Sequence, residues 1–178
     1  MSRCIVVSGP PCAGKSTLAA ALAAHYGWPL LAKDDYKERV FRHLGGRDRD
    51  WSRRVSLLAW ELLIGAAAML TRHGIDCVLE GNFRAAQAEA LRALAPGPRF
   101  IEVRCIASPE TLRARYLARA ADGTRHPGHV DLAALPEIER EFDAGAVAGL
   151  GLGGPVIDWD TTRGLDGAGL ARRLDQLL

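Results

Sequence analysis

A glycine-rich stretch, GPPCAGKST at residues 9–17, contains the residue types that bind phosphate. Four residues separate its first glycine from Gly-Lys-Ser, which is the spacing of the phosphate loop. Small residues let backbone N–H groups converge on anionic oxygens, and a following helix adds its positive end. The motif assigns Lys15 to the β and γ phosphates of a nucleotide and Ser16 to Mg²⁺. We therefore expect nucleotide binding by Gly9, Cys12, Ala13, Gly14, Lys15, Ser16 and Thr17.

The residues on either side of this stretch support the assignment. The apolar run CIVVS precedes it, and the alanine-rich stretch LAAALAAHYG follows it. A strand and a helix are therefore expected to flank the loop, as the motif requires. The alternative is a strand-to-helix turn whose glycines serve only the backbone, and the flanking patterns favour the phosphate loop over it.

A second polar cluster, KDDYK, follows a short apolar run and supplies two adjacent carboxylates. Transfer of a phosphoryl group to a hydroxyl requires that the hydroxyl is oriented and that its proton is received, which a carboxylate can do. Asp34 or Asp35 fits this role, while the other is expected to cap the next helix. The chain uses arginine for most of its positive charge, and its lysines are Lys15, Lys33 and Lys37. Because lysine remains only at these positions, we expect them to need a compact, flexible ammonium group.

Three further polar residues, Glu80, Asn82 and Arg84, stand at or just after the end of the apolar run DCVL. Nucleotide-binding sheets place an acidic group near Mg²⁺ and its waters, and we expect Glu80 in that position, with direct or water-mediated contact. Alternatively, Glu80 supports the turn at Asn82 or pairs with an arginine. Asn82 and Arg84 are expected to face an acceptor molecule.

An arginine-rich helix leads into the polar, turn-prone segment DGTRHPGHV, and this stretch resembles the mobile lid of phosphoryl-transferring enzymes, here over about residues 119–142. Such a lid closes over phosphates, excludes water and stabilises the transferred charge. We expect Arg119 and Arg125 to contribute this charge, with Arg115 as a third candidate. The alternative is a solvated arginine face. His126 and His129 have no third ligand nearby, which argues against a zinc site.

The order of the predicted elements indicates an α/β fold in one domain over residues 1–178. Short apolar strands alternate with helices, which predicts a three-layer sandwich around a five-stranded, mostly parallel sheet with ligands at the carboxyl ends of the strands. The strands are expected at 3–8, 29–32, 76–82, 99–106 and 155–159, and a helical lid completes the domain.

The longest apolar segment, Val55–Leu70, is predicted to belong to a helix that Ser52 caps and Gly74 closes. Its apolar residues run nearly all round the helix, so we expect it to cross the core rather than to cover a partner subunit. The segment is shorter than a comfortable membrane span.

The composition limits the classes of partner. The formal net charge is only +2, so no strong general field for nucleic acid or anionic membranes is present. The four cysteines lack the spacing of a zinc site or a disulfide framework. With no signal peptide pattern at the N-terminus, a cytoplasmic location is expected.

The motifs GPPCAGKST, KDDYK, LEGNF and RHPGH together resemble a family of P-loop kinases akin to polynucleotide 5′-hydroxyl kinase, chloramphenicol phosphotransferase and the zeta-toxin sugar kinases. The resemblance covers about the first 130 residues. It implies that Asp34 receives the acceptor proton and that Lys37 holds the acceptor or its phosphate. Nucleic-acid kinases of this kind usually carry arginine where Lys33 and Lys37 stand, so the resemblance favours a small acceptor.

These observations predict an ATP-dependent kinase that transfers the γ-phosphoryl group to a hydroxyl of a small molecule, with ATP and Mg²⁺ as cofactors. Asp34, Lys15, Arg119 and Arg125 are the predicted catalytic residues, and Asp35, Lys37, Asn82 and Arg84 are expected to bind the acceptor. One alternative is a 5′-hydroxyl nucleic-acid kinase. Another is a nucleotide-binding switch or sensor, although the Asn-Lys-x-Asp element of GTPase switches does not occur in the chain.

Overall fold

The computed structural model of the chain describes residues 1–46, 48–94, 97–122, 126–129, 131–143 and 149–178. Within them, five strands form one sheet in the order β2-β3-β1-β4-β5, and all four strand pairings are parallel. The strands are β1 (Arg3–Ser8), β2 (Leu30–Ala32), β3 (Cys77–Glu80), β4 (Arg99–Ile106) and β5 (Val156–Asp160). The predicted α/β fold and its five strands are therefore confirmed.

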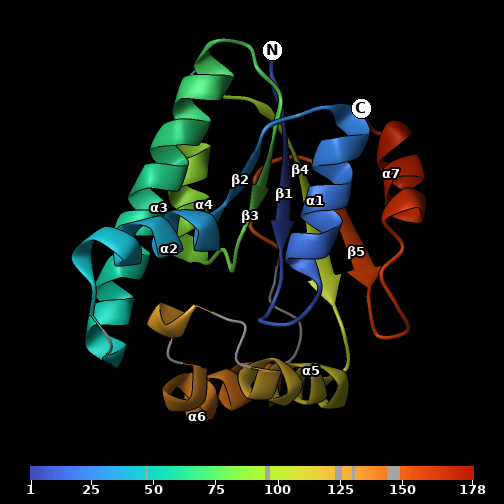
Figure 1. Cartoon of the computed structure of the whole chain (residues 1–178). Coiled ribbons are helices and arrows are strands. Elements are labelled where there is room, and N and C mark those ends of the chain that lie inside the picture. The colour runs from blue at the N-terminus through green and yellow to red at the C-terminus, as the bar shows by residue number, and fades with distance from the viewer. Residues whose placement is uncertain (47, 95–96, 123–125, 130, 144–148) are drawn as a thin grey trace.

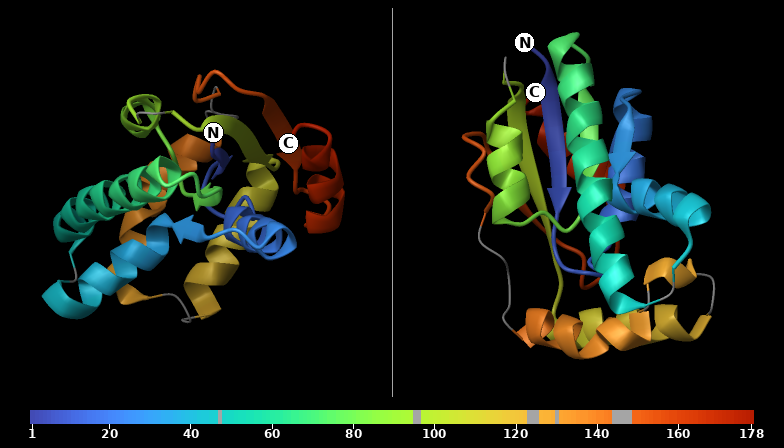
Figure 2. Two further views of the ribbon diagram at one scale, coloured as in Figure 1. Left: turned by 90° about the horizontal axis from the view of Figure 1, so that it is seen from above. Right: turned by 90° about the vertical axis from the view of Figure 1, so that its left-hand side faces the viewer.

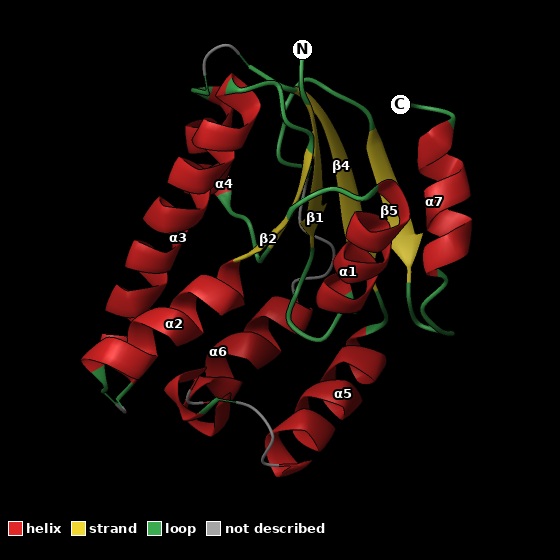
Figure 3. Ribbon diagram, turned by 45° about the horizontal axis from the view of Figure 1, so that its top comes forward, coloured by secondary structure: helices red, strands yellow, loops and turns green. Residues whose placement is uncertain are grey.

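Helices connect the strands and cover both faces of the sheet (Figures 1 and 3). Seven α-helices and one short 3-10 turn, η1, occur in the described residues. They are α1 (Lys15–Tyr26), α2 (Lys33–Leu44), α3 (Arg49–Arg72), α4 (Ala85–Arg92), α5 (Pro109–Asp122), η1 (Pro127–His129), α6 (Asp131–Asp143) and α7 (Gly167–Asp175).

Alternation of side chains along the strands produces an apolar layer on each face of the sheet. Ile5 and Val7 of β1 point to the face that α1 and α7 cover, while Cys4 and Val6 point to the face that α3 and α4 cover. Both layers are fully buried at β1. Helices thus cover the sheet on both faces (Figure 2), which leaves the strand ends to hold a site.

Helix α3 differs from its prediction in start and placement. It begins at Arg49 because the carboxylate of Asp48 accepts a hydrogen bond from the Trp51 amide at 2.7 Å, so Asp48 rather than Ser52 is the N-cap. One stripe of the helix packs on the sheet, and the other side exposes large apolar residues such as Leu57 and Met69. The expectation that α3 crosses the core is therefore wrong. At 24 residues it is long and apolar enough to span a membrane by length and composition.

Helices α5 and α6 lie across the end of the sheet to which the strands point (Figure 1). Ser108 caps α5 as expected, because its hydroxyl accepts a hydrogen bond from the Thr111 amide at 3.3 Å. Helix α6 begins at Asp131 and is longer than the predicted helix at 135–142. These two helices occupy the position that the sequence assigns to the lid.

Candidate active site

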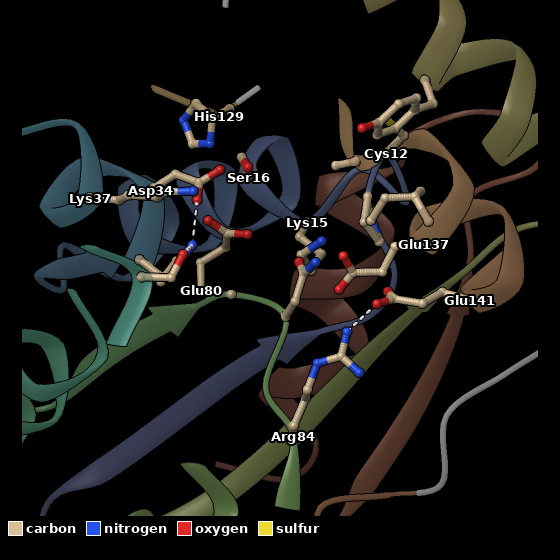
Figure 4. A pocket seen from close by; sticks show the side chains of 18 of the residues that line it. Cys12, Lys15, Ser16, Asp34, Lys37, Glu80, Arg84, His129, Glu137 and Glu141 are labelled. Atoms are coloured by element: carbon tan, nitrogen blue, oxygen red, sulfur yellow. Dashed lines mark hydrogen bonds and ion pairs between the residues drawn. The ribbon is translucent and has the colours of Figure 1, made fainter. Parts of the chain in front are cut away.

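A cleft of about 650 Å³ lies at the carboxyl edge of the sheet. The phosphate loop and α2 form part of its wall, α3 and the segment after β3 form another part, and α5 and α6 face them. Among the residues that line it are Lys15, Ser16, Asp34, Glu80 and Asn82. The structure thus brings together the polar clusters that the sequence predicts at the strand ends (Figure 4).

The backbone of the phosphate loop adopts an unusual conformation that only certain residues tolerate. Gly9 has φ of 138°, and a Cβ there would lie 2.4 Å from the carbonyl oxygen of Cys105, so no side chain fits. Cys12 has φ of 63°, a left-handed conformation that is uncommon outside glycine. Such strain gathers at ligand-binding loops and follows the tight turn between β1 and α1.

Lys15 folds back onto its own loop. Its Nζ donates a hydrogen bond to the carbonyl oxygen of Pro10 at 2.8 Å, and the side chain is buried. Burial lowers the pKa of Lys15, while the nearby carboxylate of Glu80 opposes this shift. The lysine is therefore held inside the loop that the motif assigns to phosphate, and a phosphate group offers the charge partner that the Pro10 carbonyl does not.

Glu80 ends β3 and points into the cleft between Lys15 and Asp34 (Figure 4). Burial raises the pKa of Glu80, Lys15 lowers it and Asp34 raises it further. The carboxylate of Glu80 and the hydroxyl of Ser16 are hard oxygen donors, which suit Mg²⁺ bound with phosphates and waters. Among the described residues, no three His, Cys, Asp or Glu side chains form a metal group by themselves.

The two adjacent aspartates of α2 have different surroundings. Asp34 lines the cleft, and its Oδ1 lies 3.3 Å from Nζ of Lys33, which also donates to Ser56 Oγ at 3.2 Å. Asp35 is exposed and does not line the cleft. The N-cap of α2 is Ala32, with no side-chain cap, so neither aspartate occupies the capping position. The predicted acceptor contact of Asp35 therefore finds no support in its placement.

Lys37 lines the cleft, and its ammonium is hydrogen-bonded to α3 rather than pointing free into the cleft. Its Nζ donates to Oγ of Ser52 at 2.8 Å, and Ser52 donates in turn to the carbonyl oxygen of Gly128 in η1 at 2.9 Å. His129, also in η1, is buried, and its Nε2 lies 3.0 Å from the carboxylate of Glu38. Ser52 is fully buried here. The sequence offers it only as a helix cap, so its link between Lys37 and η1 was missed.

The lid arginines divide into three cases. Arg115 donates to the carbonyl oxygen of Thr161 at 2.6 Å and to that of Cys12 at 3.4 Å, so it braces the phosphate loop. Arg119 lines the cleft with its guanidinium carbon 5.2 Å from the centre of the Tyr116 ring. Arg125 lies outside the described residues. Arg115 thus contacts the backbone of the phosphate loop, and Arg119 lines the cleft.

Three ion pairs between described residues join α3 and the segment after β3 to α6. Arg84 pairs with Glu141, and Arg49 donates to Oε2 of Glu137 at 2.5 Å. Arg53 reaches the same oxygen at 3.3 Å. Arg84 and Asn82 line the cleft as predicted. The residue pattern does not single out Arg49 and Arg53, and the one signal for them is their spacing of one helical turn.

Comparison with known proteins places this geometry in a family. The family model described as an AAA domain matches residues 4–144, which is most of the chain. A solved structure of a candidate kinase from Chloroflexus aurantiacus is 38% identical, with a TM-score of 0.92 and coverage of 99% of this chain and 98% of that one. The fold is also similar to shikimate kinase from Acinetobacter baumannii bound to shikimate, at 18% identity, TM-score 0.54 and coverage of 99% and 92%.

A curated relative is longer than this chain. An uncharacterized protein of Mycobacterium tuberculosis is 27% identical over 181 residues, which cover 96% of this chain and 33% of the relative. A protein of Mycobacterium bovis matches to the same extent. The chain therefore spans about a third of the length of the curated relatives it matches.

Proposed function

The chain belongs to the family of P-loop kinases that the AAA domain model describes, and from this premise we propose that it transfers the γ-phosphoryl group of ATP to a hydroxyl of a small molecule, with Asp34 as general base. The family supports nucleotide binding and phosphotransferase chemistry in general. The base, the acceptor and the role of each residue are proposed from the site. Because the curated relatives are about three times as long, the proposal concerns the activity of this domain.

The observation that carries the proposal is that one cleft contains both Lys15 and Asp34. A protein that only bound or slowly hydrolysed a nucleotide would need the phosphate loop without a carboxylate facing it from α2. Asp34 is half exposed to the cleft and is held by Lys33. A carboxylate in this position suits an acceptor hydroxyl that approaches the phosphate from the side of α2.

In the proposed reaction the acceptor oxygen forms a bond to the γ phosphorus, and the bond from that phosphorus to the bridging oxygen of ADP breaks. The proton of the acceptor hydroxyl passes to the carboxylate of Asp34. Lys15 exchanges its bond with Pro10 for the β and γ phosphates, and Arg119 stabilises the charge that spreads over the transferred group. Mg²⁺, which Ser16 and Glu80 would hold directly or through water, supplies positive charge to the phosphates when bound.

The experiment is a screen of hydroxylated compounds with ATP and Mg²⁺, read by ATP consumption and by the mass of a phosphorylated product. The panel contains sugars, sugar acids, polyols, hydroxylated antibiotics and oligonucleotides with a 5′-hydroxyl. Lys15→Ala serves as the control that removes the phosphate contact. A phosphorylated small molecule formed by the wild type and not by Lys15→Ala supports the proposal.

Three other outcomes contradict it. A 5′-phosphorylated oligonucleotide as the favoured product would assign the domain to nucleic acid. ATP hydrolysis that no compound accelerates would assign it to the nucleotide-binding switches. Equal product formation by Lys15→Ala would remove the phosphate loop from the reaction altogether.

A further inference from the structure

We propose that the acceptor is a hydroxy acid whose carboxylate binds Arg49 and Arg53, in the place that Glu137 of the lid occupies in this structure. The inference rests on the proposed kinase function and names the class of its acceptor. It starts from the charge of the cleft, which among the described residues is lined by eight lysine or arginine side chains and four carboxylates. An excess of this kind favours anionic ligands.

The nucleotide accounts for only part of this excess. Lys15 belongs to the phosphate loop and Arg115 contacts its backbone at Cys12, and the triphosphate is expected there. Arg49 and Arg53 instead belong to α3, on the acceptor side of the cleft. In this structure Glu137 pairs with both guanidiniums and Asp50 pairs with Arg53 at 3.2 Å, so their counter-charges are carboxylates.

Helix α3 presents a continuous stripe to the cleft. Its lining residues recur every three or four positions, so they share one helical face: Arg49, Arg53, Ser56, Leu57 and Trp60. The stripe offers two cations at one end, apolar surface next to them, and at Ser56 a hydroxyl that Lys33 links to Asp34. This is the pattern expected for a molecule with an acidic group, a carbon skeleton and a reacting hydroxyl.

The length of the stripe gives the size of the acceptor. Arg53 and Arg49 lie three and seven residues before Ser56, which corresponds to about 4.5 and about 10.5 Å along the helix axis. The acidic group and the accepting hydroxyl are therefore at opposite ends of a molecule of about monosaccharide size.

Glu137 shows that a carboxylate fits between the two arginines. Its Oε2 lies 2.5 Å from Nη2 of Arg49 and 3.3 Å from Nη2 of Arg53. The hydrogen bond from Arg49 lowers the pKa of Glu137, so the group there is a carboxylate at neutral pH. Nε of Arg49 is buried and has no hydrogen-bond partner among the described residues. An acceptor carboxylate would compete with Glu137 and could also use this remaining donor, because a guanidinium binds carboxylates through two N–H groups.

The rival explanation is that Arg49, Arg53 and Glu137 only fasten the lid. The two explanations differ in the sign of one effect. If the ion pair only fastens the lid, Arg49→Gln and Glu137→Gln break the same contact and change acceptor binding in the same direction. If Glu137 stands in for the acceptor, Arg49→Gln weakens binding of an acid and Glu137→Gln strengthens it.

The test measures binding by calorimetry in the presence of Mg²⁺ and a non-hydrolysable ATP analogue. The probes are matched sets of an aldose, its aldonic acid and its sugar phosphate, and a cyclitol with its ring carboxylic acid. We expect the carboxylic acids to bind more tightly than the other members, about tenfold weaker binding of the acids to Arg49→Gln and to Arg53→Gln, and tighter binding to Glu137→Gln. Arg54→Gln, an exposed neighbour on α3 outside the cleft, should bind like the wild type.

The inference is overturned if no acid binds, if neutral or phosphorylated members bind more tightly, or if Arg49→Gln and Glu137→Gln shift affinity in the same direction. These binding results are distinguishable from a failure of the proposed kinase function. If the wild type and Arg49→Gln phosphorylate a neutral acceptor equally, the proposed kinase function is supported and the proposal of an acidic acceptor is contradicted. Absence of transfer to every compound would contradict the kinase whatever the calorimetry shows.

Discussion

The two halves of the cleft are held in place by different means. In the phosphate half, Gly9–Thr17 are contiguous, and the backbone of a strand, a tight turn and a helix fixes them. In the acceptor half, side chains far apart in the sequence hold one another, such as Arg49 with Glu137 and Arg84 with Glu141. The backbone at Gly9 and Cys12 restricts which residues can stand there, whereas an ion pair between side chains can be exchanged by a single substitution. The difference suggests that the reaction is fixed in one half and that the choice of acceptor is adjustable in the other.

The largest effect is expected in the phosphate half. Lys15→Ala removes the ammonium assigned to the β and γ phosphates, and we expect transfer to fall by about 10³-fold or more, the order of a charged donor on a transferring phosphoryl group. Because burial lowers the pKa of Lys15 in the folded protein, loss of the ammonium should not destabilise the fold. Single-turnover kinetics and thermal unfolding measure the two effects. Transfer by Lys15→Ala at the wild-type rate would contradict the claim that the phosphate half of the cleft determines the reaction.

An intermediate effect is expected where the acceptor half meets the lid. Ser52→Ala removes a buried hydroxyl that accepts from Lys37 and donates to Gly128, and leaving such partners unsatisfied costs roughly 1–3 kcal/mol of unfolding free energy. The backbone amides of His126, Gly128 and His129 should also exchange faster with solvent. Denaturant unfolding and hydrogen exchange are the measurements. Ser56→Ala is the matched control, and the link is not supported if both variants lose equal stability.

The smallest effect is expected on the thermal stability of the protein, through the buried carboxylate of Glu80. Burial raises the pKa of Glu80, so its ionised form destabilises the folded protein. This penalty is absent below the unfolded pKa of about 4.3 and becomes complete as pH rises through the raised folded pKa. Glu80→Gln cannot ionise, so the ligand-free variant should melt at a higher temperature than wild type at neutral pH, with the advantage vanishing near about pH 4.

Thermal unfolding across this pH range checks the prediction. Glu89→Gln, at an exposed position of α4, is the control and should follow the wild type throughout. If Glu80→Gln melts at or below the wild-type temperature at neutral pH, the ionised carboxylate of Glu80 does not destabilise the fold, and the prediction is contradicted.

The same contrast explains what the sequence could predict. The phosphate loop and the alternation of strands and helices depend on neighbouring residues, so they could be recognised from short patterns. The prediction that Ser52 is the N-cap of α3 was wrong because Ser and Asp are both good helix caps. Asp48, four residues earlier, takes that position. Arg49 and Glu137 are separated by 88 residues. No local pattern reports such a pair, because tertiary packing of α3 against the lid creates it.

The local sequence pattern alone does not distinguish Asp34 from Asp35. Adjacent residues on a helix differ by about 100° in direction, since one turn holds 3.6 residues. With α2 beginning at Lys33, Asp34 lines the cleft and Asp35 does not. The resemblance to P-loop kinases favoured Asp34, and the placement of Asp34 in the cleft and of Asp35 outside it agrees with that choice.

The central claim is that Asp34 receives the acceptor proton, and the most direct test compares Asp34→Asn with Asp35→Asn. Once the screen has supplied an acceptor, the single-turnover transfer rate and the affinity for ATP are measured for both variants and the wild type. The account predicts that Asp34→Asn slows transfer by about 10²- to 10⁴-fold, roughly 3 to 5 kcal/mol of barrier, with ATP affinity retained. Asp35→Asn should transfer at nearly the wild-type rate. Wild-type transfer by Asp34→Asn, or equal losses in the two variants, would contradict the assignment.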